Sequence, residues 1–323
     1  MITISVASGT EVDTLSKAIA LLPEDDGQSV CIHLAPGIYR EKVALSRANT
    51  ILEGSGAEQT KVVFDDGATE ILPDGMKRGT FRTATMLIDA PHVTLRHLTV
   101  ENDAAPREAV GQAIALYVDA DDFLAEHCAL LGHQDTLFTA PLPPKEIQKN
   151  GFIGPKQFTP RTPQRHVYQD CLIVGDIDFI FGGAAAWFEH CEIRSVDGRK
   201  DRTAPYESYL SAASTPEGQR FGYVFYQCRL TGEGIPEHSV YLGRPWRNFA
   251  KTAFIECEMG AHIKPEGFHD WNKPDAHETM FYAEYRSSGA GAMGERAPYA
   301  HHLTDAEAAE YTLDTFLAHA LDK

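Results

Sequence analysis

A four-residue pattern centred on cysteine recurs along the chain and limits the folds open to it. Each unit has a polar residue, Cys, any residue and an apolar residue, as in His127-Cys128-Ala129-Leu130. Further units centre on Cys at 171, 191, 228 and 257, and an earlier one has Leu98 in place of Cys. Successive units are offset by 30, 43, 20, 37 and 29 residues. Irregular repeats of short strands at this spacing are typical of an all-β solenoid whose coils bury inward side chains against their neighbours.

An aromatic residue stands three positions before the cysteine in most units: Tyr168, Phe188, Phe225 and Phe254. A three-residue step breaks strict alternation, which indicates a bend between two short strands in each coil. We interpret the cysteines as stacked interior residues rather than catalytic thiols. With no C-x-x-C pair, the pattern predicts neither a zinc site nor a redox motif. A bridge between Cys171 and Cys191 is compatible with the spacing but not required by it.

Both ends of the chain predict short helices that cap the solenoid. Near the start, apolar residues at helical spacing lie on one face and Pro23 ends the run: Leu15, Ala18, Ile19 and Leu22. Near the end, Thr304 and Glu307 have the spacing of a capping box before a helical stretch that runs to residue 323. We therefore expect a single domain over residues 1–323.

Residues 141–166 interrupt the pattern as a Pro-rich basic insertion. The segment has six prolines and one acid, Glu146. Its five basic residues are Lys145, Lys149, Lys156, Arg161 and Arg165. Long ordered loops often serve as lids or binding elements, but a solvated excursion between coils is an equal alternative.

The net charge of −17 argues against nucleic acid or an anionic membrane as a partner, because both require clustered Lys and Arg. No stretch approaches the length of a membrane span, and the first residues lack the pattern of a secretion signal. We expect a monomeric cytoplasmic protein, or a secreted one if a leader has been removed.

Three stretches each place a charged residue inside an apolar frame. Asp135 follows Gly132-His133-Gln134, Asp178 precedes Phe179-Ile180-Phe181-Gly182, and Arg244 lies in Tyr241-Leu242-Gly243-Arg244-Pro245-Trp246. If the stretches stack, the charges meet, and paired carboxylates beside an arginine take unequal pKa values suited to an acid and a nucleophile. A buried ion-pair network that closes the coils is the alternative.

Five ordered motifs resemble those of pectin methylesterases: Gly37-Ile38-Tyr39-Arg40-Glu41, Gln112-Ala113-Ile114-Ala115-Leu116, Gln134-Asp135-Thr136-Leu137, Asp178-Phe179-Ile180-Phe181-Gly182 and Leu242-Gly243-Arg244-Pro245-Trp246. The resemblance covers residues 3–284. It implies a right-handed parallel β-helix without metal or other cofactor. The implied substrate is methyl-esterified polygalacturonate or its oligomers, hydrolysed to methanol and a free carboxylate.

The resemblance also implies roles for single residues. Asp178 would be the nucleophile and Asp135 the acid and then the base, with Arg244 holding Asp178 ionised. Gln112 and Gln134 would donate to the oxyanion.

Three aromatic residues are the expected sugar contacts: Phe138, Phe181 and Trp246. Phe138 stands where the family usually has Tyr, so a hydroxyl contact is lost there. Trp271 fits either a sugar contact or closure of the last coil.

Two other functions remain open. Glycosidic cleavage of the same polymer would need further carboxylates, and only Asp176 lies near the pair. A noncatalytic sugar-binding solenoid would be expected to lack one of the aspartates or glutamines.

A chain with a net charge of −17 repels polyanions, so we also expect a preference for highly methylated or short substrates. The basic insertion would then supply a local positive field.

Overall fold

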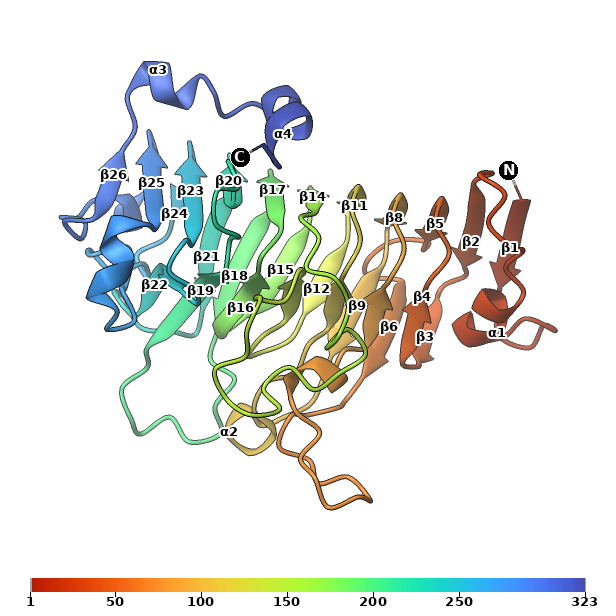
Figure 1. Ribbon diagram of the computed structural model, residues 1–323. Helices are drawn as coiled ribbons and strands as arrows, with labels where there is room; N and C mark the ends of the chain where they lie inside the picture. The colour runs from red at the N-terminus through yellow and green to blue at the C-terminus, as the bar shows by residue number, and fades with distance from the viewer. Residues whose placement is uncertain (1, 323) are drawn as a thin grey trace.

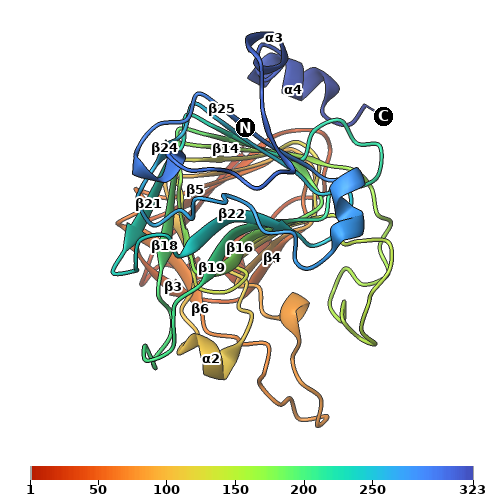
Figure 2. The same cartoon turned by 90° about the vertical axis from the view of Figure 1, so that its left-hand side faces the viewer.

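The protein forms an elongated parallel β-helix, described here over residues 2–322 from a computed structural model. Its strands stack into three sheets in which every neighbouring pair is parallel (Figures 1 and 2). In most coils the chain contributes one strand to each sheet in turn, numbered sheets 1, 2 and 3 below, and then begins the next coil. The solenoid predicted from the cysteine pattern is thereby confirmed.

Sheet 1 has 11 strands: β1 (Ile2–Val6), β2 (Val30–Leu34), β5 (Thr50–Glu53), β8 (Val93–Arg96), β11 (Phe123–Glu126), β14 (Arg165–Gln169), β17 (Ala185–Glu189), β20 (Tyr223–Tyr226), β23 (Lys251–Ile255), β25 (Phe281–Tyr285) and β26 (Ala300–His302). Sheet 2 has eight: β3 (Gly37–Arg40), β6 (Thr60–Phe64), β9 (Thr99–Asn102), β12 (Ala129–Leu131), β15 (Leu172–Gly175), β18 (Glu192–Val196), β21 (Arg229–Glu233) and β24 (Glu258–Met259). Sheet 3 has seven: β4 (Val43–Leu45), β7 (Met86–Ile88), β10 (Leu116–Val118), β13 (Leu137–Thr139), β16 (Ile177–Gly182), β19 (Ser208–Ala213) and β22 (Val240–Pro245).

Short helices occupy the ends and the connections: α1 (Leu15–Ala20), α2 (Arg107–Val110), α3 (Asp305–Ala308) and α4 (Leu313–His319), with 3₁₀ turns η1 (Thr80–Arg82), η2 (Pro274–Glu278) and η3 (Ala290–Ala292). No helix within residues 2–322 is long and apolar enough to cross a membrane.

The polar residue of each repeat makes the bend between sheets 1 and 2. His127 has a φ of 50° and His190 a φ of 52°, and the equivalent residues of the other repeats are also left-handed. One residue in this conformation turns the chain sharply, so the following cysteine points inward. This is the bend that the three-residue step predicts.

The interior is filled by ladders of like side chains. Tyr168, Phe188, Phe225 and Phe254 pair in register on successive strands of sheet 1, and their ring centroids lie 4.5–4.7 Å apart at interplanar angles of 5–11°. The six cysteines are all buried and free, including Cys171 and Cys191. Aromatic and sulfur side chains thus form one continuous core along the axis.

The two ends of the chain differ in how their helices pack. Helix α1 begins after the N-cap Thr14 and buries Leu15 and Ala18 in the interior core, as expected of a cap. At the other end the predicted capping box is present. However, α4 lies against the outer face of sheet 1, where Phe316 contacts the ring of Trp187, instead of closing the last coil (Figure 1). That face carries outward apolar side chains, which need a cover.

The insertion at 141–166 is an ordered loop held by its own basic residues. The Arg161 guanidinium donates to four carbonyl groups within the loop. Lys156 pairs with Asp89 and Asp119 of neighbouring coils, and Arg165 pairs with Asp121. Because Lys156 and Arg165 are neutralised by aspartates, the positive field expected from the insertion would come from Lys145, Lys149 and Arg161.

We predict that Phe225→Ala lowers the free energy of unfolding by about 3–5 kcal/mol, because it leaves a cavity in the middle of the aromatic ladder. Urea denaturation measures the change. Glu237→Ala alters an exposed side chain of a nearby loop and should stay within about 0.5 kcal/mol of the wild type. Equal losses in the two variants would contradict a core held by the ladder.

Candidate active site

Asp135 and Asp178 lie on adjacent coils at the outer face of sheet 3. Leu137 of β13 pairs with Ile180 of β16. Asp135 stands two residues before Leu137, and Asp178 stands two residues before Ile180. The amide of Asp135 donates to the Ile177 carbonyl at 3.0 Å. Because parallel strands lie about 4.8 Å apart, the stacking brings the two carboxyl groups together.

Both aspartates have unusual backbone conformations. Asp135 has a φ of 66° and Asp178 a φ of 49°, and the register of β16 shifts between Ile177 and Ile180. Such a bulge turns one side chain away from the regular alternation of a strand. The glycine before the second aspartate stretch is also required: a Cβ on Gly175 would lie 2.7 Å from the His133 carbonyl oxygen.

Arg244 holds Asp178 in a two-point ion pair. Its Nε donates to one carboxylate oxygen at 2.9 Å and its Nη2 to the other at 2.7 Å. The rings of Tyr209 and Trp271 each lie 3.7 Å from the guanidinium carbon. Flat contacts on the guanidinium leave little freedom to rotate, which fixes the orientation of the carboxylate.

The two carboxyl groups differ in proton affinity. Burial raises the pKa of Asp135 well above its usual range, the charge of Asp178 raises it further, and Arg244 opposes both. Burial also raises the pKa of Asp178, but hydrogen bonds and charge from Arg244 act against it. Asp135 therefore keeps a proton under conditions in which Asp178 has lost its own. This is the division predicted for an acid and a nucleophile.

Asp176 does not join Asp135 and Asp178 at the cavity. Its side chain is fully buried and forms an ion pair of 2.8 Å with Arg107. Burial raises the pKa of Asp176, while the charges of Arg107 and His133 lower it. His133 lies beside Asp176 and does not line the cavity.

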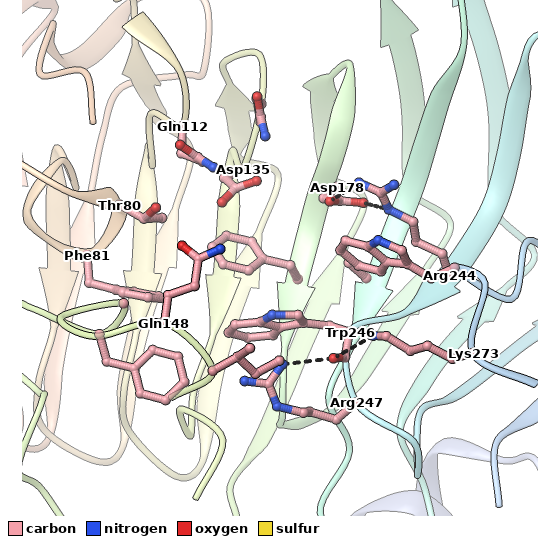
Figure 3. A pocket seen from close by; sticks show the side chains of 17 residues that line it. Thr80, Phe81, Gln112, Asp135, Gln148, Asp178, Arg244, Trp246, Arg247 and Lys273 are labelled. Carbon is pink, nitrogen blue, oxygen red and sulfur yellow. Dashed lines mark hydrogen bonds and ion pairs between the residues drawn. The ribbon is translucent and has the colours of Figure 1, made fainter. Parts of the chain in front are cut away.

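A cavity of about 420 Å³ opens over the aspartates (Figure 3). Among the predicted residues, those that line it are Gln112, Gln134, Asp135, Asp178, Phe181, Arg244 and Trp246. Both glutamines are partly exposed, so their amides are available to a ligand. The insertion reaches the cavity through Gln148 and Phe152, and the Phe152 ring contacts Trp246 at 6.1 Å. Because these residues line the cavity, the insertion is not only a solvated excursion between coils.

The prediction that Phe138 contacts sugar is wrong for this structure. Its side chain is 0% exposed and is absent from the cavity lining. It is packed among Phe81, Tyr117 and Phe181, with centroid distances of 4.7–5.0 Å. A phenylalanine in place of the usual tyrosine suits this site, because a buried hydroxyl would need a partner.

Several cavity residues were not predicted: Thr80, Phe81, Gln148, Phe152, Arg247 and Lys273. Most come from connections between strands, where no periodicity marks them. Trp271, left open by the sequence, contacts Arg244 and lines the cavity, which makes it part of the site.

A parallel β-helix with an arginine-held, unequal aspartate pair on its outer face has the groups that hydrolysis of a carboxylic ester requires. The comparison with protein families is specific. The pectinesterase family model matches residues 1–142 and 160–320, so the chain belongs to the pectinesterase family.

Curated relatives support the assignment. Pectinesterase QRT1 of Arabidopsis thaliana is 30% identical over 311 residues, which cover 94% of this chain and 73% of the relative. Pectinesterase 31 of the same plant is 29% identical, with 98% and 92% covered. Other plant relatives are longer, and this chain spans 40% of putative pectinesterase/pectinesterase inhibitor 43.

Solved structures share the fold over nearly the whole length. A pectin methylesterase in complex with a hexasaccharide has a TM-score of 0.80 at 26% identity, covering 100% of this chain and 99% of its own. The carrot pectin methylesterase has a TM-score of 0.79 at 26% identity, covering 98% and 92%. The family model does not match residues 143–159, which places the insertion outside the common pattern.

We predict that Arg244→Gln moves the acid limb of the kcat/KM profile for ester hydrolysis to higher pH. Asp178 must be ionised to act as a nucleophile, and losing Arg244 raises the pKa of Asp178. Loss of hydrogen bonds to a charged group costs about 1.5–3 kcal/mol, equivalent to a shift of roughly one to two pH units.

Arg40→Gln is the matched control, because Arg40 holds Asp103 by two hydrogen bonds at the surface, outside the cavity. Its acid limb should coincide with that of the wild type. An unmoved limb in Arg244→Gln would mean that Arg244 does not set the ionisation of Asp178.

Proposed function

We propose that this chain hydrolyses the methyl esters of galacturonate units in pectin or oligogalacturonides, releasing methanol and leaving a free carboxylate. The observation that carries the proposal is the unequal proton affinity of the stacked pair, Asp135 and Asp178, in a member of the pectinesterase family. Two carboxyl groups of opposite protonation state supply both catalysts that ester hydrolysis needs.

In the first step, ionised Asp178 attacks the ester carbonyl carbon. The carbonyl oxygen becomes an oxyanion, which receives hydrogen bonds from the amides of Gln112 and Gln134. Collapse of the tetrahedral intermediate breaks the bond to the methoxy oxygen, and Asp135 gives its proton to the departing methanol. An acyl group is then joined to Asp178 as an anhydride.

In the second step, Asp135 is a carboxylate and takes a proton from water. The water oxygen attacks the acyl carbon, and the bond to Asp178 breaks. Asp178 leaves as a carboxylate stabilised by Arg244, the galacturonate carboxyl group is free, and Asp135 is protonated again. Both aspartates return to the states in which the cycle began.

The remaining cavity residues suit a sugar chain. Phe181 and Trp246 offer apolar faces to the C–H surfaces of the rings. Tyr209 and Trp271 keep Arg244 in place and thereby act through it. Gln148 and Phe152 of the insertion bound the same cavity, so part of the proposed substrate contact comes from residues outside the match to the family model.

The proposed enzyme acts as a monomer on a pectic substrate, with neither nucleic acid nor membrane as a partner. Its location, cytoplasmic or secreted if a leader has been removed, stays a prediction from the sequence.

We predict that the wild type releases methanol from highly methylated pectin and from methylated trigalacturonate without shortening either chain. Asp178→Asn and Asp135→Asn should each lower kcat by at least about 10³-fold, as expected when a nucleophile or its proton-transfer partner is removed. Enzymatic methanol detection together with chain-length analysis measures both effects.

Asp314→Asn changes an exposed aspartate of α4 in the same way and should retain full activity. Shortened chains would point to glycosidic cleavage instead. Binding of the polymer without methanol release from either substrate would point to a noncatalytic solenoid.

A further inference from the structure

Helix α2 leads directly to Gln112, and apolar packing does not hold this helix in place. All four of its residues are partly or largely exposed. It lies outside the coils, beside the connection from β18 to β19 (Figures 1 and 2). After Gln112 the chain is fixed by its core contacts, because Ala113 and Ile114 are buried. The chain before Gln112 needs a different support.

An ion pair supplies this support by joining α2 to the coils. Arg107 Nε lies 2.8 Å from a carboxylate oxygen of Asp176, and the exposed fractions of the two side chains are 16% and 0%. Asp176 is the single residue between β15 and β16. Its carboxylate accepts the amides of Ile177 at 2.7 Å and Gly198 at 3.3 Å, and its own amide donates to the His133 carbonyl at 3.1 Å. Arg107 is therefore bound to a point that the backbone already fixes.

A second group of contacts joins α2 to residues 197–201, in the connection from β18 to β19. The Glu108 carboxylate accepts the amides of Lys200 at 2.8 Å and Asp201 at 3.1 Å. These bonds are exposed to water, so each contributes less than a buried contact between charged groups. The ion pair of α2 with the coils is thus the stronger of the two supports.

The buried ion pair is better suited to fixing geometry than to adding stability. Burial raises the pKa of Asp176, and the charges of Arg107 and His133 lower it. Because desolvation offsets much of the attraction, a buried ion pair adds little net stability compared with apolar side chains of the same volume. Asp176 lies outside the lining of the cavity, so any effect on the reaction must pass through other residues.

We propose that Asp176 and Arg107 are a positioning pair, which holds the Gln112 amide in place relative to Asp178. The inference rests on the proposed function, in which Gln112 donates to the oxyanion. The oxyanion forms only as the reaction proceeds, so a displaced donor lowers kcat more than it weakens substrate binding. A displacement of about 1 Å can lower the rate about 10²-fold.

The first test is a double-mutant cycle on methanol release from methylated trigalacturonate. Arg107→Gln and Asp176→Asn should each lower kcat about 10- to 100-fold and leave KM within about twofold of the wild type. Combined with Gln112→Ala, the same substitutions should lower kcat by less than about twofold further, because the donor that they displace is already absent. Equal losses with and without Gln112 would overturn the proposal.

A role of Asp176 through its charge alone is separated by the pH dependence. The charged groups that face Asp135 are Asp178, Arg244 and Asp176. Asp176→Asn removes a negative charge and lowers the pKa of Asp135, so the alkaline limb, where Asp135 loses its proton, moves to lower pH. The kcat values are therefore compared on the plateau of each profile. A moved limb with the plateau of the wild type would contradict positioning.

The matched control is Glu53→Gln, which breaks an ion pair of 3.0 Å with Arg96 between neighbouring coils of sheet 1. Its kcat and KM should equal those of the wild type. Arg107→Lys keeps the charge and should keep most of the activity, which a contact specific to the ion pair requires. Thermal unfolding midpoints identify misfolded variants. If Asp176→Asn does not fold, Arg107→Gln decides, because its side chain is partly exposed.

The second test is amide hydrogen exchange, which does not depend on activity. Arg107→Gln should speed exchange in residues 107–115 about tenfold and leave exchange in β17 unchanged. If the wild type releases no methanol, or if Gln112→Ala keeps full activity, the proposed function or its oxyanion donor is wrong, and exchange still decides whether the pair holds this segment. Exchange equal to that of the wild type would overturn the positioning pair.

Discussion

Parallel stacking of the coils at the strand spacing is the constraint on which the site depends. Asp135 and Asp178 are distant in sequence, and they meet because Leu137 pairs with Ile180 one coil later. Two carboxyl groups on adjacent coils disfavour each other's ionisation, so the geometry of the backbone gives them different pKa values. A shift of register by one residue would turn one carboxyl group into the core and destroy the pair.

The sequence predicts those parts of the fold and site that repeat along the chain. The cysteine pattern predicts the coils and the left-handed bend at residues such as His127, and the framed charges predict that Asp135, Asp178 and Arg244 meet. The sequence does not predict whether an aromatic side chain on the outer face of a sheet is buried under a loop or exposed to the cavity. Phe138 is buried because Phe81, from a connection many residues upstream, lies over it, and no local signal carries that information. The same limit applies to α4, whose apolar face matches the outside of sheet 1 as well as it would match an open end.

Charged side chains are arranged differently on the repeating coils and on the loops that connect their strands. The repeating coils place acidic and basic side chains in pairs on their surfaces, whereas the loops on the outer side of sheet 3 bring together the cations that line the cavity. Arg244 pairs with Asp178, and Arg161 and Lys156 hold the insertion that forms one wall of the cavity. The loops can therefore change specificity while the coils keep the aspartates in place.

The interior cysteines have a consequence for where such a fold can be made. All six cysteines are buried and free, and five of them lie in the interior core: Cys128, Cys171, Cys191, Cys228 and Cys257. Burial raises the pKa values of the thiols of Cys128, Cys171 and Cys228 well above the ordinary range. Burial also raises the pKa of Cys191, but hydrogen bonds with Cys171 and Cys228 outweigh it and lower that pKa to about 5. A protonated thiol sealed in the core is a poor partner for thiol–disulfide exchange. The coils are joined by packing and backbone hydrogen bonds, with no disulfide among the six cysteines, so their assembly does not depend on an oxidising compartment.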